Sequence, residues 1–332
     1  MRPPLQSVRS ARPQRGAALL LAMVILVLVV TLSASMVWQQ TRAVQVEAAE
    51  RARAQSAWIL HGALDWARLI LSEDQRAGRE RGQEYDALDE PWATPLAEAR
   101  LSTFLAADRD NTVDSGPEAF LSGAIVDAQS RWNLRNLVGT DGQPVPAEQA
   151  ALARLVRLAG LPDDTTVRIT DAVVSAWGPP GAAGEAGADP VLAPTRLQDL
   201  AWAGIDPALL ARLSPWVDLL PVRTPVNANT ASREALVAAI DNLDLGGAER
   251  LVQARQRRPF HTLDEVRELL GETVLEPTRI SVVSRHFEIM GRLRLDDRML
   301  EERSLVQRQP DNLGARVVVL RRERQSLDLG QP

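Results

Sequence analysis

The chain has 332 residues, enough for two or three modest domains that each bury a core. Its formal net charge is −5, so the molecule as a whole is not built to coat nucleic acid, and all of its basic side chains are arginines. It has no cysteine, which excludes disulfides, thiolate nucleophiles and cysteine-based metal sites. Its three histidines, His61, His261 and His286, are not arranged in a metal-binding spacing such as HExxH.

The N-terminal segment has the pattern of a membrane helix behind a basic leader. Residues 1–16 hold four arginines and no acid, and no charged residue occurs from Gly16 to Thr41. The apolar stretch Ala17–Trp38 would span roughly 33 Å as a helix, which matches the ~30 Å hydrocarbon core of a bilayer. By the positive-inside rule the leader stays in the cytoplasm, and the rest of the chain faces the opposite side.

The N-terminus alone allows three interpretations of this segment. It is a plain signal anchor, a secretory signal cleaved near Ser33-Ala34-Ser35, or a type IV prepilin-like leader cleaved between Gly16 and Ala17. Cleavage at the third site would leave the apolar helix on the mature protein.

The residues that follow favour the prepilin-like interpretation. No proline occurs from Gly16 to Glu90, and apolar residues recur at helical spacing in two overlapping stripes: Ile59, Ala63, Trp66 and Ile70, and Leu60, Leu64, Ala67 and Leu71. One helix is therefore predicted to run without a break to about Ala77. A long N-terminal helix that is first apolar and then amphipathic is typical of pilins, whereas a secretory signal normally ends before the mature domain begins.

The middle of the chain is predicted to be rich in helix. A strand is predicted at Glu118–Asp127, and a Gly/Ala/Pro tract at Gly178–Pro190 is predicted to be a flexible loop. The periodicity and the punctuating Gly and Pro residues predict helices at Ala147–Ala159, Asp163–Trp177, Leu197–Ala203, Pro207–Leu213, Ser232–Ile240, Gly247–Arg257 and Leu263–Leu270.

The C-terminal part changes to alternation with a period of two residues. Strands are predicted at Ile280–Leu295, Glu302–Gln309 and Ala315–Arg321, joined by turns at Asp296-Asp297 and Asp311-Asn312. A helical block thus lies between a strand near residue 120 and strands after residue 280. This order indicates an α+β domain with a helical insertion.

The segment Val226–Ser232 (VNANTAS) begins the most specific motif of the chain. Thr230 or Ser232 is expected to cap a helix, a tight connection at Asp241–Gly246 reverses the chain, and Phe260 packs beneath two helices. The pattern resembles a helix-hairpin-helix module, and the residues that carry it are Asn227, Asn229, Thr230, Gly246, Gly247 and Phe260.

Modules of this kind often bind DNA phosphates through backbone N–H groups of a Gly-rich hairpin. Here the hairpin places Asp241 and Asp244 where a phosphate would approach. The nearby basic residues are expected to form a solvated helix face: Arg250, Arg255, Arg257 and Arg258. A membrane-tethered DNA receptor is therefore the alternative function, and a compact protein-interaction fold is the favoured one.

Several motifs in a fixed order together resemble one family, the K-type minor pseudopilins of the type II secretion system. They are Arg15-Gly16-Ala17, Val126–Leu134 (VDAQSRWNL), Thr170-Asp171-Ala172, Leu219-Leu220-Pro221 and Val226–Ser232. The resemblance implies a pilin-like α+β domain, in which the long helix packs on an antiparallel sheet, with an inserted all-α domain of the SAM-like or helix-hairpin-helix type. The implied parts are a leader (1–16), a transmembrane segment (17–38), a pilin-like domain (39–145 and 278–332) and the insertion (146–277).

The resemblance also implies a place in a larger assembly. The expected position is the tip of a periplasmic pseudopilus, with the I-type and J-type minor pseudopilins and the major pseudopilin as partners. Prepilin peptidase would remove the leader at the inner membrane and methylate Ala17. Most pilins carry Glu at the fifth mature position, where it can pair with a neighbour's N-terminal ammonium, but this chain has Leu21. A subunit with no neighbour above it needs no such carboxylate.

The expected calcium site of the family is poorly matched. The aligned stretch offers Asp171, Glu185 and Asp189, too few oxygen ligands for a six- to eight-coordinate ion without help from other loops. A second acidic cluster is read as an exposed turn: Asp108, Asp110, Asn111 and Asp114. The sequence also contains no GxSxG or Walker motif and too few histidines for a proton relay, so a non-enzymatic role is expected.

Overall fold

The computed structural model describes residues 15–101, 119–178, 192–271, 273–295, 298–311 and 314–328. The chain divides into two compact units, Met1–Trp58 and Ile59–Pro332. Helix α1 (Arg15–Glu80) is a single helix of 66 residues that contributes to both units. From Ala17 it includes a segment long and apolar enough to cross a membrane, in which no residue is buried.

Within the second unit, α1 is an amphipathic helix packed on a sheet. Leu60, Leu64, Ala67 and Leu71 are buried, which confirms one of the two predicted stripes. The other stripe is only partly covered, because Trp66 keeps 54% of its surface exposed. The helix extends three residues beyond the predicted end, and Gly82 with φ +68° lies in the loop that follows it.

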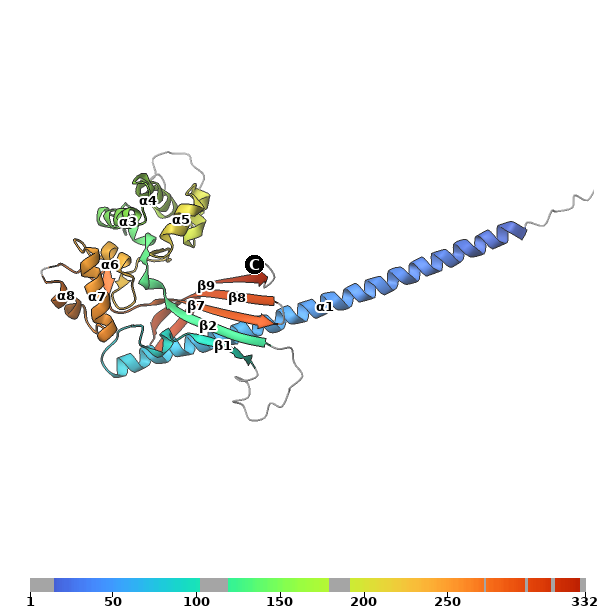
Figure 1. The fold of residues 1–332 in the computed structure, drawn as a ribbon, viewed down its shortest axis with the longest axis horizontal. Helices are drawn as coiled ribbons and strands as arrows, with labels where there is room; N and C mark the ends of the chain where they lie inside the picture. The colour runs from blue at the N-terminus through green and yellow to red at the C-terminus, as the bar shows by residue number, and fades with distance from the viewer. Residues whose placement is uncertain are drawn as a thin grey trace, which may run out of the picture. The chain divides into compact units, whose positions relative to one another are not determined.

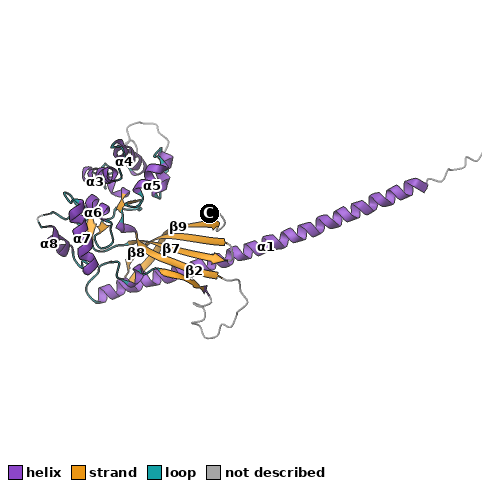
Figure 2. Cartoon of the chain, viewed as in Figure 1, coloured by secondary structure: helices purple, strands orange, loops and turns teal. Residues whose placement is uncertain are grey.

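The sheet has five antiparallel strands in the order β1-β2-β7-β8-β9 (Figures 1 and 2). They are β1 (Leu96–Arg100), β2 (Ala119–Asp127), β7 (His286–Leu295), β8 (Arg298–Asp311) and β9 (Gly314–Asp328). Leu121, Phe287 and Leu293 are buried in the clusters that also contain the buried stripe of α1. One face of the sheet and one face of the helix therefore share a core.

The C-terminal strands differ from the prediction in three ways. The predicted strand Ile280–Leu295 is two strands, β6 (Ile280–Ser281) and β7, because residues between them turn their hydrogen bonds to other partners. Asp311, predicted to be in the second turn, instead pairs with Gly314, while Asn312 and the residues of the first predicted turn, Asp296 and Asp297, lie outside the described residues. Strands β8 and β9 are longer than predicted. Outside the C-terminal part, strand β1 was not predicted.

Residues 128–285, here called the α-block, leave the sheet after β2 and return to it at β7. The predicted helices of this region are present within one or two residues at most ends. In order, its elements are η2 (Ala128–Ser130), β3 (Trp132–Asn133), η3 (Leu134–Leu137), α3 (Pro146–Leu158), α4 (Asp164–Trp177), η4 (Leu197–Ala203), α5 (Pro207–Leu213), β4 (Val217–Asp218), β5 (Val226–Asn227), α6 (Arg233–Ala239), α7 (Leu245–Arg257), α8 (Leu263–Leu270) and β6.

The α-block has a continuous apolar core and two short parallel strand pairs, β3–β4 and β5–β6. Ion pairs connect it to the sheet: Arg131 lies 3.4 Å from Glu288 on β7, and Arg196 lies 3.1 Å from Glu323 on β9. The chain thus enters and leaves this block at the end of the sheet where β2 stops and β7 starts.

Candidate functional site

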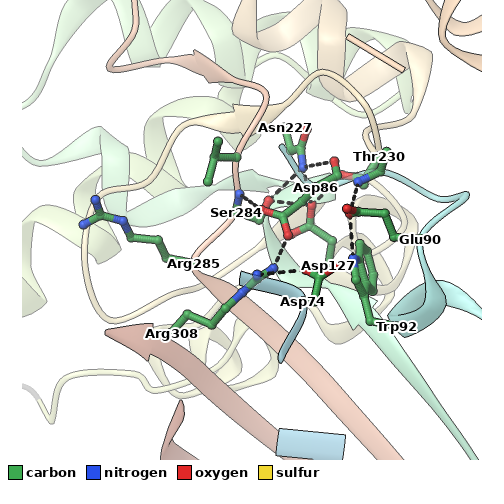
Figure 3. A network of polar contacts seen from close by, with 12 residues as sticks. Asp74, Asp86, Glu90, Trp92, Asp127, Asn227, Thr230, Ser284, Arg285 and Arg308 are labelled. Carbon is green, nitrogen blue, oxygen red and sulfur yellow. Dashed lines mark hydrogen bonds and ion pairs between the residues drawn. The ribbon is translucent and has the colours of Figure 1, made fainter. Parts of the chain in front are cut away.

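The end of the sheet holds a network of buried polar side chains, which we call the polar junction (Figure 3). Its members come from α1, the segment after α1, strands β2 and β8, the residues at and after β5 inside the α-block, and the segment before β7: Asp74, Asp86, Glu90, Trp92, Asp127, Asn227, Thr230, Ser284 and Arg308. It is the place where five parts of the chain that are distant in sequence meet.

Asp127, the last residue of β2, is the acceptor at the centre of the junction. Its Oδ2 accepts hydrogen bonds from Thr230 Oγ1 at 2.6 Å, Ser284 Oγ at 2.6 Å and Asn227 Nδ2 at 3.0 Å, and its Oδ1 accepts one from the backbone of Gln129 at 2.8 Å. Burial raises the pKa of Asp127, and these donors oppose that shift. The carboxylate therefore holds both ends of the α-block.

Asn227 joins the α-block to the loop after α1. Its Nδ2 lies 3.0 Å from the backbone oxygen of Asp86 and 2.9 Å from Ser284 Oγ, and the side chain is fully buried. The backbone N–H of Ser284 in turn donates to Asp86 Oδ2 at 2.7 Å. Each of these buried groups depends on the others for a partner, so the loss of one leaves several unsatisfied.

Arg308 on β8 supplies the buried positive charge of the junction. Its guanidinium contacts Asp86 and lies 3.1 Å from Asp74 Oδ2, and it stacks over the ring of Phe287 at 4.3 Å. The side chain is 3% exposed. Figure 3 shows it pointing into the carboxylates, whereas Arg285 points away from them.

Three carboxylates share this one guanidinium. Oxygen atoms of Asp74, Asp86 and Glu90 all lie within 4.8 Å of one another, and Glu90 Oε2 also accepts hydrogen bonds from the backbone of Ala87 and from Trp92 Nε1, both at 2.9 Å. Burial raises the pKa of Asp86 to about 7 and that of Glu90 to about 6. A cavity of about 70 Å³ opens beside Asp74 and Asp86.

The predicted hairpin residues are brought together, but in packing roles. Asn229 exchanges two hydrogen bonds of 2.8 Å with the backbone of Phe260, which is buried beneath α6 and α7. A Cβ on Gly247 would lie 2.6 Å from a methyl carbon of Leu243, so this glycine permits close packing of the hairpin. Gly246 is exposed in the first turn of α7. Ser232 is the residue that caps α6, while Thr230 bonds Asp127 instead.

The two acids of the hairpin form contacts within the protein. Asp241 Oδ1 lies 2.9 Å from Arg154 and its Oδ2 lies 2.8 Å from Arg279, while Asp244 caps α7 by accepting from Gly247 N at 2.6 Å. The expectation of a solvated arginine face was wrong for Arg255. Burial lowers its pKa to about 10, and it donates to the backbone oxygen of Ala228 at 2.7 Å.

The residues of the predicted processing site lie at the start of α1. Gly16 and Ala17 are helical, and the side chains of Ala17 and Leu21 are exposed. Residues 1–14 of the predicted leader lie outside the described part of the chain.

The weak calcium candidates do not form a site among the described residues. Asp171 is exposed on α4, whereas Glu185, Asp189 and the acidic cluster at 108–114 lie outside the described residues. The described carboxylates that do cluster, those of the polar junction, do not fit a cation, because Arg308 already occupies Asp74 and Asp86.

Two family models described as type II secretion system protein K match the α-block, over residues 130–222 and 226–282. The chain is 29% identical to type II secretion system protein K of Pseudomonas aeruginosa over 90% of each chain. It is 29% identical to the same protein of Klebsiella pneumoniae, over 91% of this chain and 94% of that one. These matches confirm the resemblance to the K-type minor pseudopilins of the type II secretion system that the sequence motifs indicated.

A solved structure supports the fold of this chain. A chain from the crystal structure of the GspK-GspI-GspJ complex of enterotoxigenic Escherichia coli matches with a TM-score of 0.60 and 20% identity, over 84% of this chain and 98% of that one. The long N-terminal helix and the antiparallel sheet of an α+β fold are thereby confirmed. Whether the α-block is of the SAM-like type stays a prediction.

Sequence reasoning missed most of the polar junction. It identified the segments around Asp127 and Asn227 as motifs, but it assigned no role to Asp74, Asp86, Glu90 or Arg308. Asp74 lies near the end of the amphipathic helix and Asp86 and Glu90 follow it, but nothing in the sequence pairs these acids with an arginine more than 200 residues later.

Proposed function

We propose that this protein is a non-enzymatic minor pseudopilin at the tip of the type II secretion pseudopilus. Prepilin peptidase removes the leader between Gly16 and Ala17, and the mature helix stays in the inner membrane until assembly, with the globular part in the periplasm. There the subunit joins the I-type and J-type minor pseudopilins above the major pseudopilin and supports protein export across the outer membrane.

The observation that carries this proposal is the continuity of α1. The helix is apolar directly after Gly16 and becomes a sheet-packing element by Leu60, without an interruption between them. A leader cut at Gly16 would leave this element whole, whereas a cut after Ser35 would remove its apolar half. Leu21 supports the tip position, because a carboxylate there would be buried in lipid without a neighbour's ammonium.

A second support is an exposed stripe on α1 that faces away from the sheet. Trp66 and Leu69 are 54% and 55% exposed, and a Cβ on Gly62, one turn earlier, would meet nothing within 4 Å. Glycine inside a helix costs about 1 kcal/mol relative to alanine, so its use here favours a close approach by another helix. We assign this stripe to contact with neighbouring pseudopilin helices.

Mass spectrometry of the native N-terminus tests the processing step. We expect a mature protein that begins with a methylated Ala17. A protein that keeps Met1, or one that begins at Met36, would contradict the proposal.

Co-purification of the full-length chain with the I-type and J-type minor pseudopilins tests the assembly. We expect a stoichiometric complex that Gly62→Leu weakens, because the larger side chain blocks close helix approach. Gly62→Ala is the matched control, which should retain more of the complex. Failure of the unaltered chain to co-purify with either partner would contradict the assembly.

The alternative of a DNA receptor has no support in the hairpin. Asp241 and Asp244 are held in place by arginines and by a helix cap, so negative charge stays where a phosphate would bind. We do not propose it further.

A further inference from the structure

We propose that the polar junction holds a dissociable proton among Asp74, Asp86 and Glu90, and that loss of this proton loosens the attachment of the α-block to the sheet. This would make the protein a pH-responsive subunit, more firmly joined in mildly acidic than in alkaline surroundings. The inference does not depend on the proposed place in the pseudopilus.

The first argument is the charge count. Arg308 is the buried guanidinium that contacts the group, and it faces Asp74 and Asp86, with Glu90 beside them and Asp127 close behind Asp86. Four ionised carboxylates around one guanidinium would leave a large uncompensated negative charge in a poorly hydrated site. Such a charge is expensive, and the usual outcome is that a carboxyl group retains a proton.

The second argument is the proximity of two acids. An oxygen of Asp74 and an oxygen of Glu90 lie within 4.8 Å of each other, and Glu90 is buried. Two ionised carboxylates at this separation repel each other, and a proton on one of them relieves the repulsion. The proton therefore belongs to a group of acids that titrate together.

No other neighbouring group among the described residues supplies the positive charge that would make this proton unnecessary. Arg81 lowers the pKa of Asp74 but is exposed to solvent, and Arg79 is paired with Glu84 at 3.0 Å. Figure 3 shows the guanidinium of Arg285 directed away from the carboxylates. The remaining titratable neighbours supply no positive charge near neutral pH, because they are acids or are neutral there: Asp89, Tyr85, whose pKa is raised by burial, and His286, whose pKa burial lowers to about 4.

The direction of the effect follows from the shifts. Burial raises the pKa of Asp86 to about 7 and that of Glu90 to about 6, both above the values of the unfolded chain. The folded protein therefore binds more protons than the unfolded chain between about pH 4 and pH 7. The contribution of these two groups to the free energy of unfolding is fully present at the acidic end of this range, and it is lost as the pH rises through 6 and 7.

The junction transmits this change to the α-block. Asp86 receives the backbone N–H of Ser284 on its side chain and the amide of Asn227 on its backbone oxygen. Ser284 and Asn227 also bond Asp127, whose charge repels that of Asp86. An additional negative charge on the Asp74–Asp86–Glu90 group therefore strains the bonds that hold β5 and the segment before β7.

The test uses the full-length chain in detergent micelles. Its melting temperature should fall by roughly 3 °C between pH 6 and pH 8, the shift expected for about one proton released in a chain of this size. Glu90→Gln should remove at least half of that fall, because it takes one titrating carboxylate out of the group while the amide oxygen can still accept from Trp92 Nε1. The matched control is Glu148→Gln. It removes another carboxylate that accepts from an indole, that of Trp132, but that is paired with a guanidinium of its own, that of Arg279. This variant should show the same fall in melting temperature as the unaltered chain.

Hydrogen exchange locates the effect. After correction for the intrinsic rate, peptides covering 226–231 and 281–285 should lose protection at pH 8 in the unaltered chain and keep it in Glu90→Gln, while α3 is unchanged. A melting temperature that is flat or rises from pH 6 to pH 8 would overturn the proposal. So would an undiminished fall in Glu90→Gln, or equal protection of both junction peptides at the two pH values.

Discussion

Two ionic clusters of this protein contain the same kinds of groups, an indole, carboxylates and a guanidinium, but they differ in the ratio of acids to guanidiniums. Inside the α-block, Glu148 Oε2 accepts from Trp132 Nε1 at 3.0 Å, and its other oxygen lies 3.2 Å from Arg279. In the polar junction, Glu90 accepts from Trp92 in the same way and lies beside Arg308. The first cluster adds Asp241 together with Arg154, two acids for two guanidiniums, whereas the junction sets three acids around one.

The difference indicates which cluster is only structural. Burial acts to raise the pKa of Asp241, but Arg279 and Arg154 hold it below its usual value, and the side chain is 49% exposed. Burial raises the pKa of Glu148, the buried acid of this cluster, while Arg279 acts to lower it. The junction compensates for missing positive charge with a proton. A buried ionic group that responds to pH is therefore recognised by its charge balance, and burial alone is a poor guide.

The largest effect is expected from removing each arginine. Arg308→Met and Arg279→Met should each lower the free energy of unfolding by about 3–5 kcal/mol, because they leave buried carboxylates unpaired. The loss should grow more between pH 6 and pH 8 for Arg308→Met, which frees Asp74 and Asp86 together. Asp241 keeps Arg154 in the other variant, so only Glu148 is freed.

Urea unfolding of the full-length chain in micelles at the two pH values measures both losses. If the two variants show the same pH dependence, the contrast between the clusters is wrong.

A smaller effect is expected from the two indoles. Trp92→Phe and Trp132→Phe each remove one hydrogen bond to a carboxylate, worth about 1.5–3 kcal/mol. The cost of Trp92→Phe should be lower at pH 6 than at pH 8, since the bond favours the ionised form of Glu90. The cost of Trp132→Phe should be nearly constant, and the same urea experiment checks both. A larger cost of Trp92→Phe at pH 6 than at pH 8 would contradict the proposal that the acids near Trp92 hold a proton at the lower pH.

The smallest effect is expected from a helix cap beside the junction. Ser232→Ala removes the Oγ that accepts from Ala235 N at 3.2 Å and should cost about 1 kcal/mol. The cost should be equal at pH 6 and pH 8, because a hydroxyl cap carries no charge. Thermal unfolding at the two pH values measures it, and a pH-dependent cost would place the source of the pH response outside the carboxylates.

The sequence predicted most of the helices because each is a local pattern. Periodicity and caps placed α3 to within one residue at each end, and the long helix to within three residues of its end. Strand β1 was not predicted, because its sequence LAEAR lacks a regular alternation of apolar and polar residues and includes residues that favour helices. The break at 282–285 escaped because Val282 and Val283 continue a strand-like pattern, and only the tertiary bonds of Ser284 interrupt it.

The site was predicted only where it coincided with a motif. The asparagines of the motif VNANTAS bond Asp127 in the polar junction and the backbone of Phe260, roles that the motif itself did not indicate. The carboxylates around Arg308 are brought together by long-range contacts, more than 200 residues apart for Asp86 and Arg308. No local pattern encodes such a pairing.

The place where the α-block joins the sheet determines how the block could be exchanged. Asp127 at the end of β2 pairs with Phe287 at the start of β7, and the five strands of the sheet follow one another in sequence order as an up-and-down meander. The meander is complete without residues 128–285, which take the place of one hairpin turn. Replacing the whole block by another segment would therefore leave the strand order of the sheet unchanged. The same loop is where an engineer could exchange the block for another, provided that the new one supplies partners for Asp127.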